Sequence, residues 1–350
     1  MHDRREGRDE SRPYNLLHRK HMLQHSFGSR LLPGNALAGR RCILFDLGDT
    51  LWSRGDTQTW AQQEAIANHR AIELLRKHIQ SDLLPMLDDF VLGQRVRQTI
   101  DRHIRARILR NPNIEPDGPG AVIDTLTDLG IPMIDRELGA TIFEALRIRI
   151  PESRSLFPDT HSTLRELQRR GYLLGVVTNR IWGGQPFQED LCVLGLDQYF
   201  PPDLMAVSGD LGVRKPNPAI FQHALKARQV SPEEAVMVGD SLSADVLGAQ
   251  ALGIFAIWKP KPEILARISS QKPATSNIHI SDPNALGPEI QPEETTEQSP
   301  PPGLHRTDDD FMLAQDRSRD YLERYLRGEI QPDLIIEHLS DLLDIFVKAS

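Results

Sequence analysis

The chain has 350 residues, 39% of them hydrophobic and 26% charged, and a net charge of −8. This is an ordinary composition for a soluble protein with room for one large domain or two modest ones, and the negative charge argues against binding to nucleic acid or an anionic membrane. No run of 18 apolar residues occurs, which argues against a transmembrane helix. Only two cysteines occur, far apart, which argues against a disulfide framework or a zinc site and favours a reducing, cytoplasmic compartment.

The first half of the chain predicts one strand followed by a long helical segment. Residues 1–38 carry mixed charges and no apolar stretch, so we expect a disordered leader and not a secretory signal. The apolar run at 41–45 predicts a buried parallel strand. Roughly a hundred residues then show helical spacing and no strand pattern. The helices are expected near 57–80, 85–109, 120–129 and 135–149.

From residue 158 onward, helical and strand patterns alternate. Strands are expected at 172–177, 203–207, 235–238 and 253–258, and helices at 159–170, 187–194, 217–228 and 242–252. Asp159 is expected to cap the first of these helices. This alternation predicts the α/β class, with a doubly wound parallel sheet covered by helices on both faces.

The C-terminal quarter of the chain changes composition. Residues 270–308 are rich in Pro, Ser, Thr and Glu and predict a disordered linker. A helical pattern returns near 309–327. The last residues, 333–347, predict a final strand and an amphipathic helix of the same core.

Four short segments place polar residues where predicted strands end and loops begin. Ligands bind at that edge of an open α/β sheet. Each segment alone also has an ordinary explanation, such as a turn, a helix cap or a surface lysine. They are FDLGDTL at 45–51, VVTN at 176–179, VSGDLGVRKPNPAIF at 207–221 and VMVGDSLSADVLGAQALG at 236–253.

In this order, the four segments resemble the four motifs of the haloacid dehalogenase-like superfamily. The resemblance covers roughly residues 41–258 together with 333–347. It implies an α/β core formed by 39–52, 156–258 and 333–347. Residues 53–155 would then be a helical cap inserted after the first strand, as in the helical-cap branch of the superfamily, and 259–332 a linker or insertion, largely disordered.

The resemblance implies a set of catalytic residues. Asp46 would be the nucleophile, attacking phosphorus to form an aspartyl-phosphate and so dividing a difficult displacement into two steps. Thr178 would hydrogen-bond an oxygen of the transferring phosphoryl group, with Asn179 as a further substrate contact. Lys215 would neutralise the repulsion between the two anions.

The resemblance also implies a Mg²⁺ site. Carboxylates and carbonyls are the ligands that this hard cation requires. Asp46 and Asp240 would bind the metal directly. Asp245 would be a second ligand or would orient Lys215 or a metal-bound water. The backbone carbonyl of Gly48 would be another ligand, and the same loop would contact the substrate.

The chain departs from the family pattern at Gly48. Most phosphatase members carry an Asp there as the general acid–base, whereas this chain has Asp49 one place later, and adjacent side chains point in different directions. Three interpretations stay open. The loop is rearranged so that Asp49 serves; catalysis proceeds without the acid, which is typically worth about 10²–10⁴-fold; or the protein is catalytically weak. Some branches of the superfamily also have Gly here.

Taken together, these features predict a Mg²⁺-dependent phosphatase acting on a small phosphorylated metabolite. A metal-independent 2-haloacid dehalogenase is an alternative, although it would have no use for the Gly239-Asp240 pair. Phosphoryl transfer or mutase chemistry is another. The alternative from a different class is a binding or regulatory protein that kept the fold, whose disordered segments would contact a protein partner.

Overall fold

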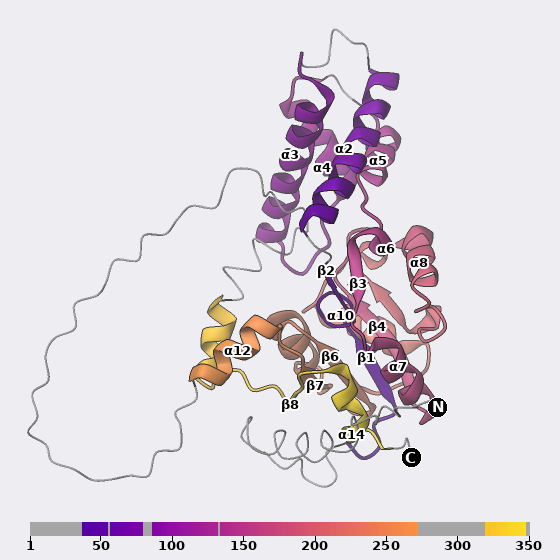
Figure 1. Cartoon of the computed structure of the whole chain (residues 1–350), viewed down its shortest axis with the longest axis vertical. Helices are drawn as coiled ribbons and strands as arrows, with labels where there is room; N and C mark the ends of the chain where they lie inside the picture. Colours follow the sequence, from indigo (N-terminus) through magenta and orange to yellow (C-terminus); the bar gives the residue numbers. More distant parts are fainter. Residues whose placement is uncertain (1–36, 55–56, 80–85, 132–133, 272–318, 348–350) are drawn as a thin grey trace, which may run out of the picture.

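The computed structural model describes residues 37–54, 57–79, 86–131, 134–271 and 319–347. The expected disordered leader and the Pro-rich linker therefore lie almost entirely outside the described residues. The described chain forms a helical bundle at one end and an α/β core at the other (Figure 1). The bundle is formed by residues between the first two core strands along the chain.

A six-stranded sheet in the order β5-β4-β1-β6-β7-β8 forms the centre of the core. Every neighbouring pair in it is parallel, so all six strands end at the same edge. β1 lies near the middle, with Cys42 opposite Leu173 on one side and Ala235 on the other. The strands are β1 (Cys42–Phe45), β4 (Leu173–Thr178), β5 (Met205–Val207), β6 (Ala235–Gly239), β7 (Phe255–Trp258) and β8 (Leu334–Ile335).

Helices cover both faces of this sheet, which confirms the predicted doubly wound α/β class. Successive side chains of a strand point to opposite faces, so Ile43 and Phe45 join one buried cluster while Cys42 and Leu44 join the other. The first cluster includes α7 (Thr160–Arg169), α8 (Gly184–Val193) and α14 (Leu342–Ile345). The second includes α10 (Pro218–Lys226), the π-helix η4 (Leu242–Leu247), α11 (Gly248–Gln250) and α12 (Pro262–Gln271).

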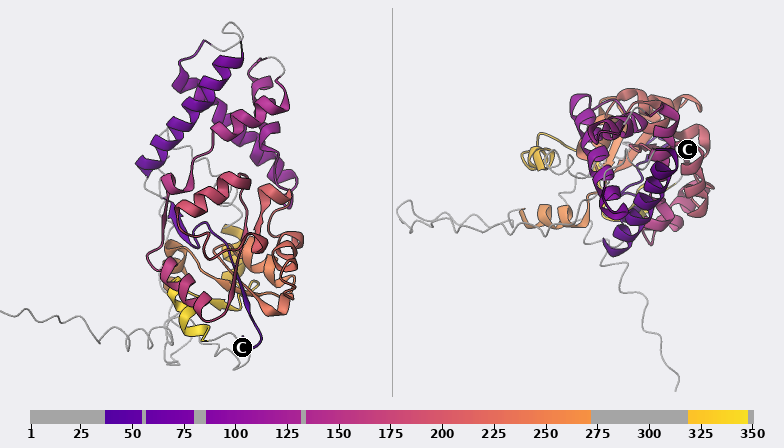
Figure 2. Two further views of the ribbon diagram at one scale, coloured as in Figure 1. Left: turned by 90° about the vertical axis from the view of Figure 1, so that its right-hand side faces the viewer. Right: turned by 90° about the horizontal axis from the view of Figure 1, so that it is seen from above.

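Four helices form the bundle inserted between β1 and β4, which we call the cap. Their apolar faces, spaced as the sequence predicted, meet in a third buried cluster. Two of the helices begin at capping aspartates: Asp88 accepts hydrogen bonds from two backbone N–H groups, and Asp135 accepts one from Leu138 at 2.8 Å. The helices are α2 (Thr57–His78), α3 (Asp89–Arg110), α4 (Gly118–Asp128) and α5 (Arg136–Ala145), and they stand beyond the core in the left view of Figure 2.

A short ribbon joins the cap to the core. β2 (Trp52–Arg54) pairs antiparallel with β3 (Arg154–Leu156), which follows α6 (Ile150–Ser153). The sequence showed no strand pattern here, because three residues are too few for a recognisable alternation. The ribbon brings the two ends of the insert together directly after β1.

The cap contacts the core at a second place. The loop between α3 and α4 runs antiparallel to residues 212–214: the N–H of Glu115 donates to the Gly212 carbonyl at 3.0 Å, and that of Arg214 donates to the Asn113 carbonyl at 3.1 Å. A buried ion pair between Arg214 and Glu115 accompanies these bonds, with 3.2 Å between nitrogen and oxygen. The cap is therefore held to the segment that carries Lys215.

Some local expectations are wrong. Asp159 precedes α7 as predicted, but its carboxylate makes no cap and instead accepts a hydrogen bond from the N–H of Ser340 at 2.9 Å. The expected closing helix is only a 3₁₀ turn, η5 (Leu339–Asp341), and the single turn of α14.

In the C-terminal segment, α12 lies where a linker was expected. Residues 319–326 are helical within the predicted helix near 309–327, whose first part lies outside the described residues. Across the described residues, every helix is too short or too polar to serve as a transmembrane segment.

Candidate active site

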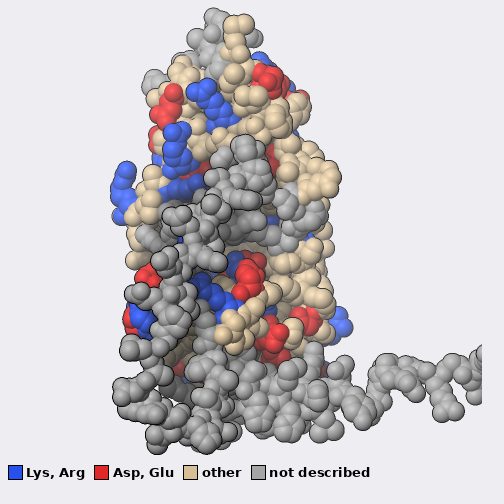
Figure 3. All heavy atoms as spheres, turned by 60° about the vertical axis from the view of Figure 1, so that its left-hand side comes forward, with Lys and Arg blue, Asp and Glu red and all other residues tan. Residues whose placement is uncertain are grey.

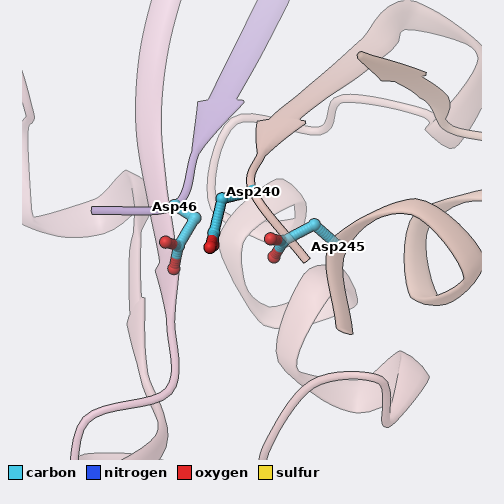
Figure 4. Close-up of side chains that lie close together, drawn as sticks. All are labelled: Asp46, Asp240 and Asp245. Atoms are coloured by element: carbon cyan, nitrogen blue, oxygen red, sulfur yellow. The ribbon is translucent and has the colours of Figure 1, made fainter. Parts of the chain in front are cut away.

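The sheet brings together side chains from four distant segments. Asp46 follows β1, Thr178 ends β4 and Asp240 follows β6, so the three residues meet at one edge because these neighbouring strands are parallel. Lys215 comes from the loop before α10, and Asp245 from η4. Figure 4 shows the three carboxylates converging, Asp46 from one strand end and Asp240 and Asp245 from the segment after β6.

The ammonium group of Lys215 is the centre of this arrangement. It is 3% exposed and contacts three oxygens, one for each of its three N–H donors. These are Oδ1 of Asp46 at 2.7 Å, Oδ1 of Asp245 at 2.7 Å and the carbonyl of Val177 at 2.6 Å. Burial opposes the charge of this amine, but the two carboxylates outweigh burial and raise its pKa. Lys215 is therefore a fixed positive charge beside Asp46.

Asp245 uses both of its oxygens inside the protein. Oδ1 accepts from Lys215, and Oδ2 accepts from the backbone N–H of Ser241 at 2.9 Å. The carboxylate lies so close to Gly239 that a Cβ there would be 2.2 Å from Oδ2. Glycine at 239 therefore leaves the space that Asp245 occupies. Of its two predicted roles, this placement favours the orientation of Lys215.

Asp46, Asp240 and Asp245 together form a possible cation site. One carboxylate oxygen from each lies within 4.8 Å of the others. Burial raises the pKa of Asp46 to about 6 in spite of Lys215, and it raises the pKa of Asp240 well above its ordinary value in spite of Lys261. Neighbouring carboxylates add to both shifts. A divalent cation would relieve this repulsion, and the all-oxygen donor set fits Mg²⁺.

Asn179 lies beside Lys215. Its Oδ1 accepts from the backbone N–H of Lys215 at 2.7 Å, and its Nδ2 donates to the carbonyl of the same residue at 3.1 Å. This pair of bonds holds the backbone that carries the ammonium. The sequence predicted a substrate contact here, and the geometry favours a positioning role. Thr178 is 5% exposed at the end of β4, where the sequence placed it.

In the loop after Asp46, the next acidic residue, Asp49, is held in an ion pair. Asp49 has a φ of 55°, and its carboxylate forms an ion pair with Lys261, whose amine also lies 3.7 Å from Oδ2 of Asp240. Gly48 is exposed, and a Cβ built on it would have no atom within 4 Å. The loop therefore has space for a side chain at position 48, and the carboxylate at position 49 is already paired.

Two lysines at this edge were not found from the sequence. Lys259 donates to the Asp49 carbonyl at 3.3 Å and lies over the ring of Phe157, 4.0 Å from its centroid. Burial lowers the pKa of Lys259. Both lysines follow β7, the next strand of the sheet, and their position after a predicted strand end was the available signal. Figure 3 shows basic and acidic side chains together at a hollow beneath the helical cap.

Three comparisons place these features among known proteins. A family model described as a haloacid dehalogenase-like hydrolase matches residues 40–253. The chain is 40% identical over 129 residues to a phosphoserine phosphatase of Thermus thermophilus, covering 37% of this chain and 48% of that protein. It is 41% identical over 103 residues to a glyceraldehyde 3-phosphate phosphatase of Pyrococcus furiosus, covering 29% and 40%.

Among solved structures, a HAD phosphatase from Thermococcus onnurineus is 25% identical, with a TM-score of 0.41, and the match covers 63% of this chain and 87% of that one. The chain spans about half the length, or less, of the two curated relatives named above.

Proposed function

We propose that this chain, which belongs to the haloacid dehalogenase-like hydrolase family, is a Mg²⁺-dependent phosphatase of a small phosphorylated metabolite. The observation that carries the proposal is the buried Asp46 carboxylate, held 2.7 Å from the Lys215 ammonium beside a second carboxylate suited to a cation. The two named relatives with phosphatase activity support the same reaction.

In this proposal, Asp46 acts as the nucleophile. One of its oxygens forms a bond to phosphorus while the bond from phosphorus to the ester oxygen breaks, and the leaving alkoxide takes a proton from solvent water. Water then attacks the aspartyl-phosphate, releasing inorganic phosphate and restoring the carboxylate. Mg²⁺ held by Asp46, Asp240 and the Gly48 carbonyl would supply neutralising charge at the phosphoryl oxygens.

The remaining residues fix the charges around this carboxylate. Lys215 contributes a positive charge whose position is set by Asp245 through the ammonium and by Asn179 through the backbone. The Thr178 hydroxyl is available at the neighbouring strand end. Donors fixed in advance stabilise a transition state without having to reorganise, so Asn179 and Asp245 would act through Lys215.

A phosphate-release screen tests the proposed function. We expect the purified chain to hydrolyse aryl and alkyl phosphates with Mg²⁺ present, to lose this activity in EDTA, and to regain it when Mg²⁺ is added back. Asp240→Asn should raise the Mg²⁺ concentration needed for half-maximal rate at least about tenfold, because it removes a charged ligand. Asp197→Asn, at an exposed position, is the matched control.

Two outcomes would contradict the proposal. Equal phosphate release in EDTA and in Mg²⁺ would remove the metal from the mechanism. Metal-independent halide release from a 2-haloacid, with no phosphate release from any ester, would identify a dehalogenase instead.

Because there is space for a side chain at position 48, we predict that a substitution there increases activity. We propose that hydrolysis proceeds without a side-chain acid at 48, since Asp49 is paired with Lys261. Gly48→Asp should then raise kcat, because a Cβ at this position meets no atom within 4 Å and a carboxyl there would supply a proton to the leaving oxygen. We expect a gain of about 10²-fold on alkyl phosphates, the lower end of the effect of a general acid, and a smaller gain on aryl phosphates, whose leaving groups need less help.

Gly48→Asn is the matched control, since it adds similar bulk without a proton to donate. Its kcat should stay near that of the wild type. A rate unchanged by Gly48→Asp on both substrate classes would show that another group already fills the acid role.

A further inference from the structure

A small cavity lies where the cap meets the core. Its volume is about 30 Å³, and it is bounded by the cap helices α2 and α3, by the segment leading into β3 and by the loop after β4. A buried water needs roughly 10–15 Å³ on this measure, so the cavity holds about two waters, or a group the size of a carboxylate. Its polar and aromatic lining consists of Trp60, Arg97, Ser153, Arg154, Arg180 and Trp182.

Three arginines line this space, and none of the described lining residues is acidic. Arg97 comes from α3 and is 3% exposed; it donates to the Leu146 carbonyl at 2.7 Å and to the amide oxygen of Asn68. Arg154, on β3, lies over the Trp60 ring, 4.6 Å from its centroid. Arginines present planar, fixed donors that match a carboxylate. The lining is therefore suited to an anion.

The third arginine of the lining is close in the chain to Thr178. Arg180 is two residues beyond Thr178, so their Cα atoms are at most roughly 7 Å apart. Its backbone is fixed on both sides: its N–H donates to the Ser208 hydroxyl at 2.7 Å, and its carbonyl accepts from Gly209 at 2.9 Å. A molecule of a few carbons is therefore long enough to span the distance between Thr178 and Arg180.

The aromatic wall of the cavity is also held in place. Trp182 stacks on Phe143 of α5, with 4.7 Å between ring centroids and 11° between planes, and its indole N–H donates to the Phe143 carbonyl at 3.3 Å. A site whose walls are already ordered loses little entropy when a ligand binds.

We propose that this cavity binds a second anionic group of the substrate, a carboxylate, while the phosphoryl group lies at Asp46. The inference rests on the proposed phosphatase function and assigns its substrate class: short phosphorylated acids. The limited volume favours a planar carboxylate over a second phosphate. The cap would then select substrates by charge at the end remote from the reaction.

A matched pair of esters tests this assignment. 3-Phosphoglycerate and glycerol 3-phosphate differ only in a carboxylate against a hydroxymethyl group. We expect kcat/KM to be about 10- to 100-fold higher for the acid, the usual effect of hydrogen bonds to a charged group. A generic aryl phosphate tests the phosphatase function separately: no hydrolysis of any ester would contradict that function, whereas hydrolysis of both members of the pair at equal kcat/KM would overturn the cavity assignment alone.

Variants of the lining arginines test whether the preference for the acid arises in the cavity. Arg180→Gln and Arg154→Gln should each bring the ratio of the two kcat/KM values toward one, chiefly by lowering the value for the acid, and Arg180→Lys should keep part of the preference. Arg110→Gln, an exposed position at the end of α3, should leave both values unchanged. Equal losses on both substrates in both Gln variants would indicate a merely structural role and would overturn the proposal.

Discussion

Asp46→Asn is expected to lower phosphate release by about 10⁴-fold or more and to leave the fold intact. An amide cannot attack phosphorus, and removal of the nucleophile in other covalent hydrolases costs losses of this order or greater. The amide oxygen can still accept the bond from Lys215. The measurement is phosphate release at saturating Mg²⁺, together with trapping of the phosphorylated chain by acid quench, which should succeed only with the wild type.

The stability of this variant separates loss of chemistry from loss of structure. Burial raises the pKa of Asp46 to about 6, whereas an Asp carboxyl in an unfolded chain has a pKa of about 3.9. The folded state therefore holds this proton more tightly, and the contribution of Asp46 to stability is lost as the pH rises from about 4 to about 6. Without divalent cations at pH 7, the variant should unfold at the same temperature as the wild type or at a higher one. A variant with a lower unfolding temperature and normal activity would contradict the role of Asp46.

Lys215→Met is expected to have a second large effect, on both stability and rate. The methionine keeps the apolar stem but leaves two buried carboxylates, Asp46 and Asp245, without their shared ammonium. Removing one partner from a buried ionic group typically costs about 3–5 kcal/mol. Loss of a fixed charge at the reaction centre should lower kcat by about 10²–10³-fold. Urea denaturation in EDTA and steady-state kinetics in Mg²⁺ measure the two effects.

The direction in which pH changes the destabilisation by Lys215→Met can also be predicted. Without the ammonium, the folded-state pKa of Asp46 moves further upward, so the folded state loses more stability as the pH rises through that range. The destabilisation should therefore be larger at pH 8 than at pH 5. Lys226→Met, at an exposed position on α10, should change the free energy of unfolding little at either pH. Equal stability of the Lys215 variant and the wild type at pH 8 would show that the buried network contributes nothing.

Local sequence patterns were sufficient to predict those elements of the fold that form by burying apolar side chains. The apolar run before Asp46 predicted a strand covered on both faces, and β1 is completely buried. Helical spacing predicted the helices of the insert for the same reason, because their apolar faces had to meet each other. The order of the polar strand ends then brought Asp46, Thr178 and Asp240 to one edge, since parallel strands share the direction in which they end.

The features that the sequence did not reveal depend on contacts between distant residues. Asp159 is of a residue type that commonly caps helices, yet its carboxylate accepts a hydrogen bond from the N–H of Ser340 instead. For Asn179 the sequence predicted a substrate contact, and it did not reveal the two hydrogen bonds between its amide and the Lys215 backbone. Lys261 pairs with Asp49 across more than two hundred residues. In each case, the partner is determined by tertiary packing, which cannot be predicted from local sequence propensity.

The three contacts of Lys215 have a consequence for the order of events. An ammonium has three hydrogens, and all three are already bound to Asp46, Asp245 and Val177. An arriving phosphoryl oxygen can engage this group only by exchange. Asp245 is held a second time by Ser241, and the Val177 carbonyl is part of the backbone, so the exchangeable acceptor is Asp46. Under the proposed function, arrival of the ester would therefore release Oδ1 of Asp46, the proposed nucleophile, from Lys215 at the moment when the phosphoryl group takes its place.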